Sequence, residues 1–233
     1  MDSTKKTAQL AGLLYFLSSL TAPFGLLYVP GKLFVPDDAA GTAERIRTFE
    51  SLMRWGIAAN LVGGVLFIFA VLALYWLFKP VSEKHALAML VLILLSFPIS
   101  ALNVLNELAA LKLATGTALS AIDPPQRDAL AYLFLWLHNR AYVIAQIFWG
   151  LWLFPFGICV IRSGFIPRFL GVLLMIAGAG YPISSFAELV LPQHAEAVRR
   201  MTMILAFGEL PIIFWLLIRG AKPQRGPAPA LTT

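Results

Sequence analysis

The stretch from Trp55 to Phe78, WGIAANLVGGVLFIFAVLALYWLF, runs for 24 residues without a charged side chain. A helix of about 20 apolar residues crosses the hydrocarbon core of a bilayer, which is roughly 30 Å thick. Five other long stretches are similarly apolar. We therefore predict an all-α, polytopic membrane protein that sits among membrane lipids as a bundle of six transmembrane helices. This domain should cover residues 1–221, with spans at about residues 10–29, 55–78, 86–113, 130–161, 169–191 and 201–218.

The overall composition also indicates a membrane protein. Of the 233 residues, 59% are hydrophobic and 13% are charged, and the mean hydropathy is +0.79. A soluble domain has about 25% charged residues. The net charge of +6 is spread over short connectors, which is typical of membrane-flanking charge and argues against nucleic acid as a partner. The single Cys159 cannot form an intramolecular disulfide, and we interpret it as a packing residue.

An even number of spans places both termini on the same side of the membrane. If that side is the cytoplasm, the inner segments carry nine lysines and arginines and the outer segments carry eight, while most acidic residues lie outside. Because lysine and arginine favour the cytoplasmic side, we predict cytoplasmic termini. The first apolar stretch is long enough to span, so we interpret it as a helix and not as a cleaved signal. Residues 222–233, with three prolines and no apolar periodicity, should form a disordered tail.

Proline interrupts five of the six predicted spans. Proline removes one backbone donor and crowds the preceding turn, so each of these residues is a predicted kink: Pro23, Pro98, Pro155, Pro182 and Pro211. Gly171 and Gly178 are one heptad apart in the fifth span and offer a surface for close helix packing.

The longest connector runs from Pro30 to Arg54. Apolar residues recur within it at helical spacing, at Ile46, Phe49, Leu52 and Met53. This pattern predicts either a short amphipathic helix at the membrane surface or an N-terminal extension of the second span.

The fourth span has a strong helix-start signal, with Asp123 as the cap and Pro124 at the first helical position. A helix from Pro124 to Ile161 would contain 38 residues and be about 57 Å long. That length exceeds the bilayer, so the first turns should protrude. Gly164 and Pro167 should form the turn into the fifth helix, with Pro167 at its first position.

Polar side chains inside the spans provide the main indication of function. Each ionisable group costs a few kcal/mol to insert, so it needs a partner or a wet cavity. Helical spacing places these residues on single faces of the third, fourth and fifth spans. Because successive spans run in alternating directions, most of these residues lie at a similar depth in the membrane, and Glu209 of the sixth span lies deeper. The candidate residues are Asn103, Asn106, Glu107, His138, Asn139, Arg140, Tyr142, Gln146, Ser185, Glu188 and Glu209.

We interpret these residues as a polar cavity, open toward the extracytoplasmic side, that binds or transports a small or lipid-like molecule. A structural or accessory subunit, in which the same residues only fix helix packing, is the alternative. An intramembrane metal-dependent enzyme is less favoured, because the chain has only three histidines and lacks HExxH, CxxC and GxSxG motifs. We therefore assign no catalytic residue, no metal and no cofactor. The sequence carries no signal for the oligomeric state.

Several long runs resemble a known family. They are NVLNELAAL (Asn103 to Leu111), QIFWGLWLFPFG (Gln146 to Gly157), RSGFIPRFLGVLLMIAGAGY (Arg162 to Tyr181), GELPIIFWLLIRG (Gly208 to Gly220) and AGLLYFLSSLTAPFGLLYVPGKLFV (Ala11 to Val35). These runs are similar to the bacterial integral membrane family called domain of unknown function 4386. The resemblance implies a multi-pass protein of the cytoplasmic, or inner, membrane, and it implies no substrate.

Overall fold

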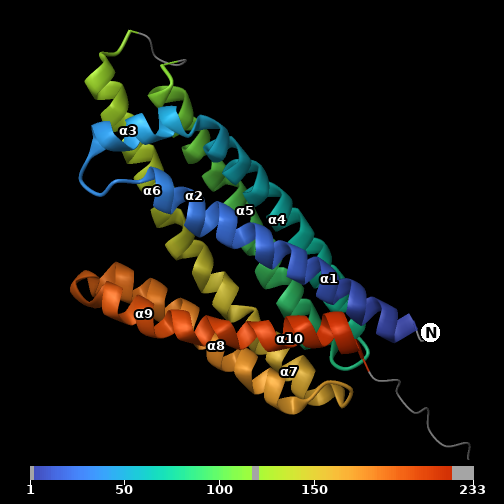
Figure 1. Cartoon of the computed structure of the whole chain (residues 1–233). Helices are drawn as coiled ribbons and strands as arrows, with labels where there is room; N and C mark the ends of the chain where they lie inside the picture. The colour runs from blue at the N-terminus through green and yellow to red at the C-terminus, as the bar shows by residue number, and fades with distance from the viewer. Residues whose placement is uncertain (1–2, 117–120, 222–233) are drawn as a thin grey trace, which may run out of the picture.

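The computed structural model describes residues 3–116 and 121–221, and these residues form helices and short connections without any strand (Figure 1). Six helices are long and apolar enough to cross a membrane, which confirms the predicted number of spans. The predicted tail, residues 222–233, lies outside the described residues. The spans are residues 4–33, 50–78, 83–114, 124–163, 168–190 and 192–219.

The helical segments within these spans follow the chain in a simple order. The first span contains α1 (Ser3–Pro23), the π-helical turn η1 (Phe24–Tyr28) and α2 (Val29–Leu33). The second and third are α4 (Glu50–Phe78) and α5 (Glu83–Ala114). The fourth contains α6 (Pro124–Leu151) and α7 (Leu153–Ser163), and the fifth is α8 (Arg168–Val190). The last span joins the following short segments: η2 (Pro192–His194), α9 (Ala195–Ala206), η3 (Phe207–Glu209), α10 (Leu210–Phe214) and η4 (Trp215–Arg219).

The six spans form a closed ring. Each span contacts the next along the chain, and the sixth returns to pack on α1. In Figure 1, α1, α4, α5 and α6 lie side by side, and α8 with the sixth span crosses below them. Gly220 lies against Lys5, so the beginning and end of the bundle meet at the same end of the molecule.

Two apolar cores lie at opposite ends of the bundle. The first is centred on the fully buried Trp152 and gathers side chains from α1, α4, α5, α7, α8 and α10. The second lies where α2 and α3 (Ala39–Thr48) cover α4, α5 and α6. Side chains on the outer faces of the helices contact lipid, so the packing of helix against helix in these two cores is what stabilises the fold.

Three predicted kinks coincide with irregular backbone. A π-helical turn directly follows Pro23, Trp152 interrupts the fourth span three residues before Pro155, and a 3₁₀ turn precedes Pro211. Pro155 and Pro211 cannot donate to the carbonyl one turn earlier, which is where the winding changes, whereas the π-helical turn lies on the C-terminal side of Pro23. Helices α5 and α8 continue through Pro98 and Pro182.

Glycines let α8 approach the fourth span at backbone contact distance. A Cβ atom at Gly150 would lie 2.5 Å from the Gly178 carbonyl oxygen, and one at Gly157 would lie 2.6 Å from that of Gly171. The two glycines of each span are seven residues apart. Because the two spans are antiparallel, the earlier glycine of one meets the later glycine of the other. The glycines of the fifth span therefore meet glycines of the fourth, which fixes how α8 packs on α6 and α7.

The connector between the first two spans contains a separate helix, α3, and α4 begins two residues after it. Ile46 of the predicted apolar pattern therefore lies in α3 and Leu52 and Met53 lie in α4, while Phe49 is the residue between the two helices. The Asp38 carboxylate caps α3 by accepting from the Gly41 N–H at 2.8 Å. Ile46 is fully buried, so the apolar face of α3 covers the second core.

An ion pair fastens α3 to the protruding start of α6. The Arg47 guanidinium donates to the Asp128 carboxylate at 2.9 Å and to the Ala114 carbonyl oxygen at 3.2 Å. The hydrogen bond that Arg47 donates to Asp128 raises the pKa of Arg47, so the arginine stays charged at any ordinary pH.

The fourth span begins at Pro124 as predicted, although the Asp123 side chain makes no capping hydrogen bond. Gly164 has a φ of 70° and ends α7 in the left-handed region that glycine tolerates. Pro167 precedes the first helical residue of α8 and does not itself occupy that position.

Candidate functional site

Two ionisable side chains are buried together between α5 and α6. Glu107 is 1% exposed and His138 is completely buried. The Glu107 Oε1 and His138 Nε2 atoms lie 3.5 Å apart. Each group therefore has the other as the partner that an ionisable side chain needs inside a membrane.

The surroundings of His138 fix the role of each ring nitrogen. Nδ1 lies 3.4 Å from the backbone carbonyl oxygen of Asn103, which can only accept. In a neutral ring with its hydrogen on Nδ1, Nε2 presents a lone pair to Glu107. Among residues 3–116 and 121–221, neither His138 Nε2 nor Glu107 Oε2 has a hydrogen-bond partner.

Amide side chains lock α5 to α6 around this pair. The Asn103 amide donates to the His138 carbonyl oxygen at 2.9 Å, and the Asn106 amide donates to the Asn103 side-chain oxygen at 2.9 Å. The first bond holds the third and fourth spans together, since no water in the hydrocarbon region competes for it, and the second lies within α5 and orients the Asn103 amide.

The second span, α4, also contributes to this cluster, through Asn60. Its amide donates to the Tyr142 hydroxyl at 3.2 Å and also interacts with the Glu107 carboxyl. The Tyr142 ring packs edge-on against the His138 ring, with 4.8 Å between the ring centres. The buried pair is thus enclosed by polar groups from α4, α5 and α6.

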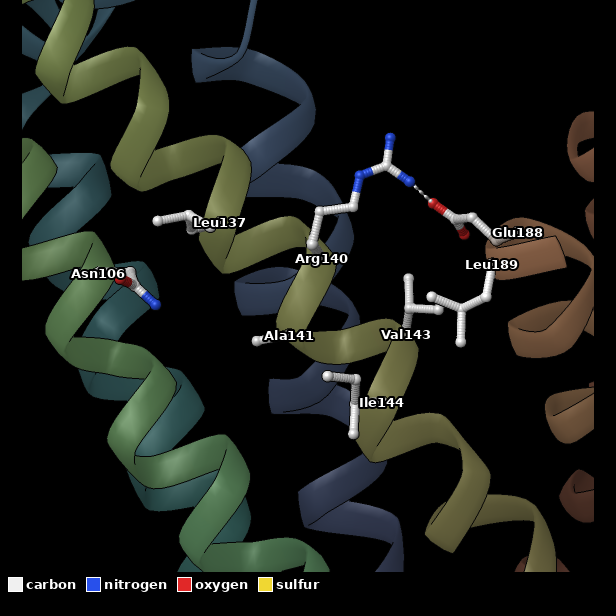
Figure 2. Close-up of a pocket in the computed structure, with 8 residues that line it drawn as sticks. All are labelled: Asn106, Leu137, Arg140, Ala141, Val143, Ile144, Glu188 and Leu189. Carbon is white, nitrogen blue, oxygen red and sulfur yellow. Dashed lines mark hydrogen bonds and ion pairs between the residues drawn. The ribbon is translucent and has the colours of Figure 1, made fainter. Parts of the chain in front are cut away.

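Arg140 and Glu188 form a second, more exposed group. The Arg140 side chain reaches from α6 to the Glu188 carboxylate on α8 (Figure 2). The guanidinium also lies over the Trp136 ring, 5.1 Å from its centre. The two side chains remain 47% and 29% exposed, so this pair is open to the surroundings and the Glu107–His138 pair is closed.

Two hollows share this ion pair. The first has a volume of about 310 Å³ and is lined mainly by apolar side chains. Besides Arg140 and Glu188, the residues that line it are drawn in Figure 2: the polar Asn106 and the apolar Leu137, Ala141, Val143, Ile144 and Leu189. The second has a volume of about 230 Å³ and is lined by Arg140, Glu188, Pro192, Ala195, Glu196 and Arg199. An apolar space and a charged space therefore meet at Arg140 and Glu188.

Glu209 belongs to a third group, about two helical turns along α8 from the Arg140–Glu188 pair. Its carboxyl accepts hydrogen bonds from the Tyr15 hydroxyl on α1 and, at 2.5 Å, from the Tyr181 hydroxyl on α8. Glu209 ends the 3₁₀ turn before Pro211, so its position follows from the break in the sixth span. Three spans meet at this carboxyl.

The predicted site residues therefore fall into separate groups and do not line one common cavity. Asn139 and Gln146 are half-buried, and neither makes a hydrogen bond within the part of the chain that the structure describes. Ser185 is buried, and its hydroxyl has no hydrogen-bond partner among residues 3–116 and 121–221. Within those same ranges, no three histidine, cysteine, aspartate or glutamate residues gather as a metal site would require.

The candidate residues did not include three members of these groups, Asn60, Tyr15 and Tyr181. Asn60 and Tyr15 do not belong to a periodic polar face. Asn60 is the only amide in the second span, and Tyr15 lies in an apolar stretch of the first. A search for isolated polar residues at mid-span depth would have found both, because an unpaired polar group is costly there.

Comparisons with known proteins identify the family without assigning an activity. An uncharacterized protein of Archaeoglobus fulgidus is 37% identical over 79 residues, which are 34% of this chain. The match covers 46% of that protein, so the chain spans about half of its length. No solved structure matches the chain. The family model described as domain of unknown function (DUF4386) matches residues 10–220, and the chain belongs to this family.

Proposed function

We propose that this membrane protein binds an amphipathic, lipid-like molecule where α6 meets the end of α8. The observation that carries the proposal is the pair of hollows that share Arg140 and Glu188. Their volumes of about 310 and 230 Å³ suit a small ligand or one chain and headgroup of a larger one.

The two hollows differ in chemistry as the two ends of an amphiphile do. The first is bounded by aliphatic side chains such as Leu137, Ile144 and Leu189, which suit a hydrocarbon chain. The second has two arginines and two glutamates in its lining, so its charges balance. A zwitterionic headgroup fits this balance better than a strongly anionic one, because each of its charges finds an opposite charge.

Retained lipid measures this function directly. The protein would be purified in mild detergent, and its bound lipids extracted and identified by mass spectrometry. We expect a zwitterionic lipid with the wild type, and several-fold less of it with Arg140→Gln or Glu188→Gln. Arg54→Gln is the matched control, since Arg54 forms a somewhat more exposed ion pair with Glu50 at the start of α4, outside both hollows. Equal lipid in all four proteins would contradict the proposal.

A structural or accessory role is the second candidate, and the Glu107–His138 pair favours it. Both side chains are buried and neither lines the two hollows, so they contribute to packing without contacting a ligand there. If this role is the whole function, Glu107→Gln lowers the melting temperature and no variant changes the bound lipid. If the protein binds lipid, the hollow variants lose the lipid while the melting temperature changes little.

We also propose that the protein lies in the inner membrane with both termini in the cytoplasm. The proximity of Gly220 to Lys5 supports a common side for the two ends, and the Lys/Arg distribution favours the cytoplasm. The hollows would then lie toward the extracytoplasmic half. A reporter that is active only in the periplasm should be inactive when fused to the C-terminus. An active fusion would place the C-terminus in the periplasm and contradict the proposed orientation.

A further inference from the structure

We infer that Glu209 is a reversible proton-binding site that links the broken sixth span to the first and fifth spans. Nothing in the lipid-binding proposal requires it, because none of its contacts lines the two hollows. The inference starts from the position of the carboxyl at the helix break and from the hydroxyls around it.

The carboxyl has donors on both oxygens and no cation. Tyr15 donates to Oε2 and Tyr181 donates to Oε1. These two tyrosines are the titratable groups that act on Glu209. Among residues 3–116 and 121–221, no lysine, arginine or histidine forms an ion pair with it. A carboxylate held only by neutral donors at mid-span leaves its negative charge uncompensated, and binding a proton removes that charge.

A proton fits this site better than a metal cation does. Hard cations take six or more oxygen ligands as a rule. The described site offers two carboxyl and two phenolic oxygens, and the phenolic hydrogens point toward the carboxyl. One proton needs only one of these oxygens.

Proton binding changes which contacts can coexist. In the ionised form both tyrosines donate, so α1 and α8 are both fastened to the turn at Glu209. When a proton from water binds one carboxyl oxygen, that oxygen gains a hydrogen to donate and becomes a weaker acceptor, so the bond from its tyrosine is weakened or reversed. Protonation therefore loosens or reverses one of the two connections. The 3₁₀ turn before Pro211 is the place where the sixth span can adjust, since proline leaves the Phe207 carbonyl without its α-helical donor.

Infrared difference spectroscopy on the purified full chain tests the inference. The carbonyl stretch of protonated carboxyls would be followed between about pH 5 and pH 9, where unperturbed aspartate and glutamate contribute little. We expect the wild-type band to contain a titrating component that is lost in Glu209→Gln and kept in Glu83→Gln, a control at an exposed carboxyl that pairs with Lys79. Any contribution from the buried Glu107 carboxyl remains in both variants. The band should show the same titration with sodium or potassium as the only salt.

The tyrosine contacts give a second measurement should Glu209→Gln fail to fold. Replacing Tyr15 and Tyr181 by phenylalanine removes both donors, so a larger fraction of Glu209 should be protonated at a given pH. A spectrum that is identical in the wild type, Glu209→Gln and the double tyrosine variant would overturn the inference. A band that responds to sodium concentration and not to pH would overturn it in favour of a cation site.

Discussion

Replacing Gly157 with alanine should weaken the packing of α7 on α8. A Cβ atom at this position would lie 2.6 Å from the Gly171 carbonyl oxygen, which is backbone and cannot rotate away. Ordinary van der Waals contact begins at 3.4 Å, so the two helices must separate by roughly 0.8 Å. Overpacking of this kind costs about 1–3 kcal/mol of the free energy of unfolding.

Alanine also favours a helix over glycine by about 1 kcal/mol, and a control is needed to remove that gain. Gly31 supplies it, because it is helical and a Cβ atom there would meet nothing within 4 Å. Gly31→Ala should therefore be neutral or slightly stabilising, and the difference between the two variants isolates the steric cost. Reversible unfolding by titration of a denaturing detergent into mild micelles measures both free energies. If Gly157→Ala proves as stable as Gly31→Ala, the close α7–α8 contact is refuted.

Two further predictions concern the polar contacts. Glu107→Gln should cost less than about 1 kcal/mol, since the amide can donate to His138 Nε2, which has no hydrogen-bond partner among the described residues. Glu107→Leu offers no donor or acceptor to the buried histidine and should cost about 1–3 kcal/mol. Thermal melting in detergent compares the two variants, and equal melting temperatures would contradict this expectation. Asp128→Asn should cost about 0.2–1 kcal/mol, because the Arg47 pair is partly exposed and screened, and the loss should shrink at high salt. Because the pKa of Arg47 is raised, a rise in pH removes the stabilisation by this ion pair only at extreme alkaline values. The melting temperature should therefore show no change due to this pair between about pH 6 and pH 9.

Span number and helix faces could be predicted from sequence because both depend on local composition and on a period of 3.6 residues. The face of the third span that carries Asn103 and Glu107 is indeed the buried one. Contacts between spans could not be predicted in this way. Depth and face allow Arg140 to meet either Glu107 or Glu188, and the choice depends on how α8 rotates about its own axis, which the backbone contact of Gly150 with Gly178 sets.

Glu209 shows the same limit more sharply. Its sequence position gives its depth, and Pro211 gives the helix break. Its partner Tyr15, however, is 194 residues away in an apolar stretch, and only closure of the ring of spans brings the two together. Polar partners from spans distant in sequence therefore escape any argument based on periodicity within one helix.

Helix α8 is the element through which the polar groups can influence one another. Tyr181 contacts Glu209 and Glu188 contacts Arg140, and these two residues of α8 are seven positions apart, about two helical turns. Pro182 lies between them, so the Gly178 carbonyl receives no helical hydrogen bond from that position. Glycines hold the earlier turns of α8 against the fourth span, and the turns beyond Pro182 carry Glu188. If Glu209 binds a proton and the hollows bind lipid as proposed, the segment of α8 from Tyr181 to Glu188 is the shortest structural link between the two sites.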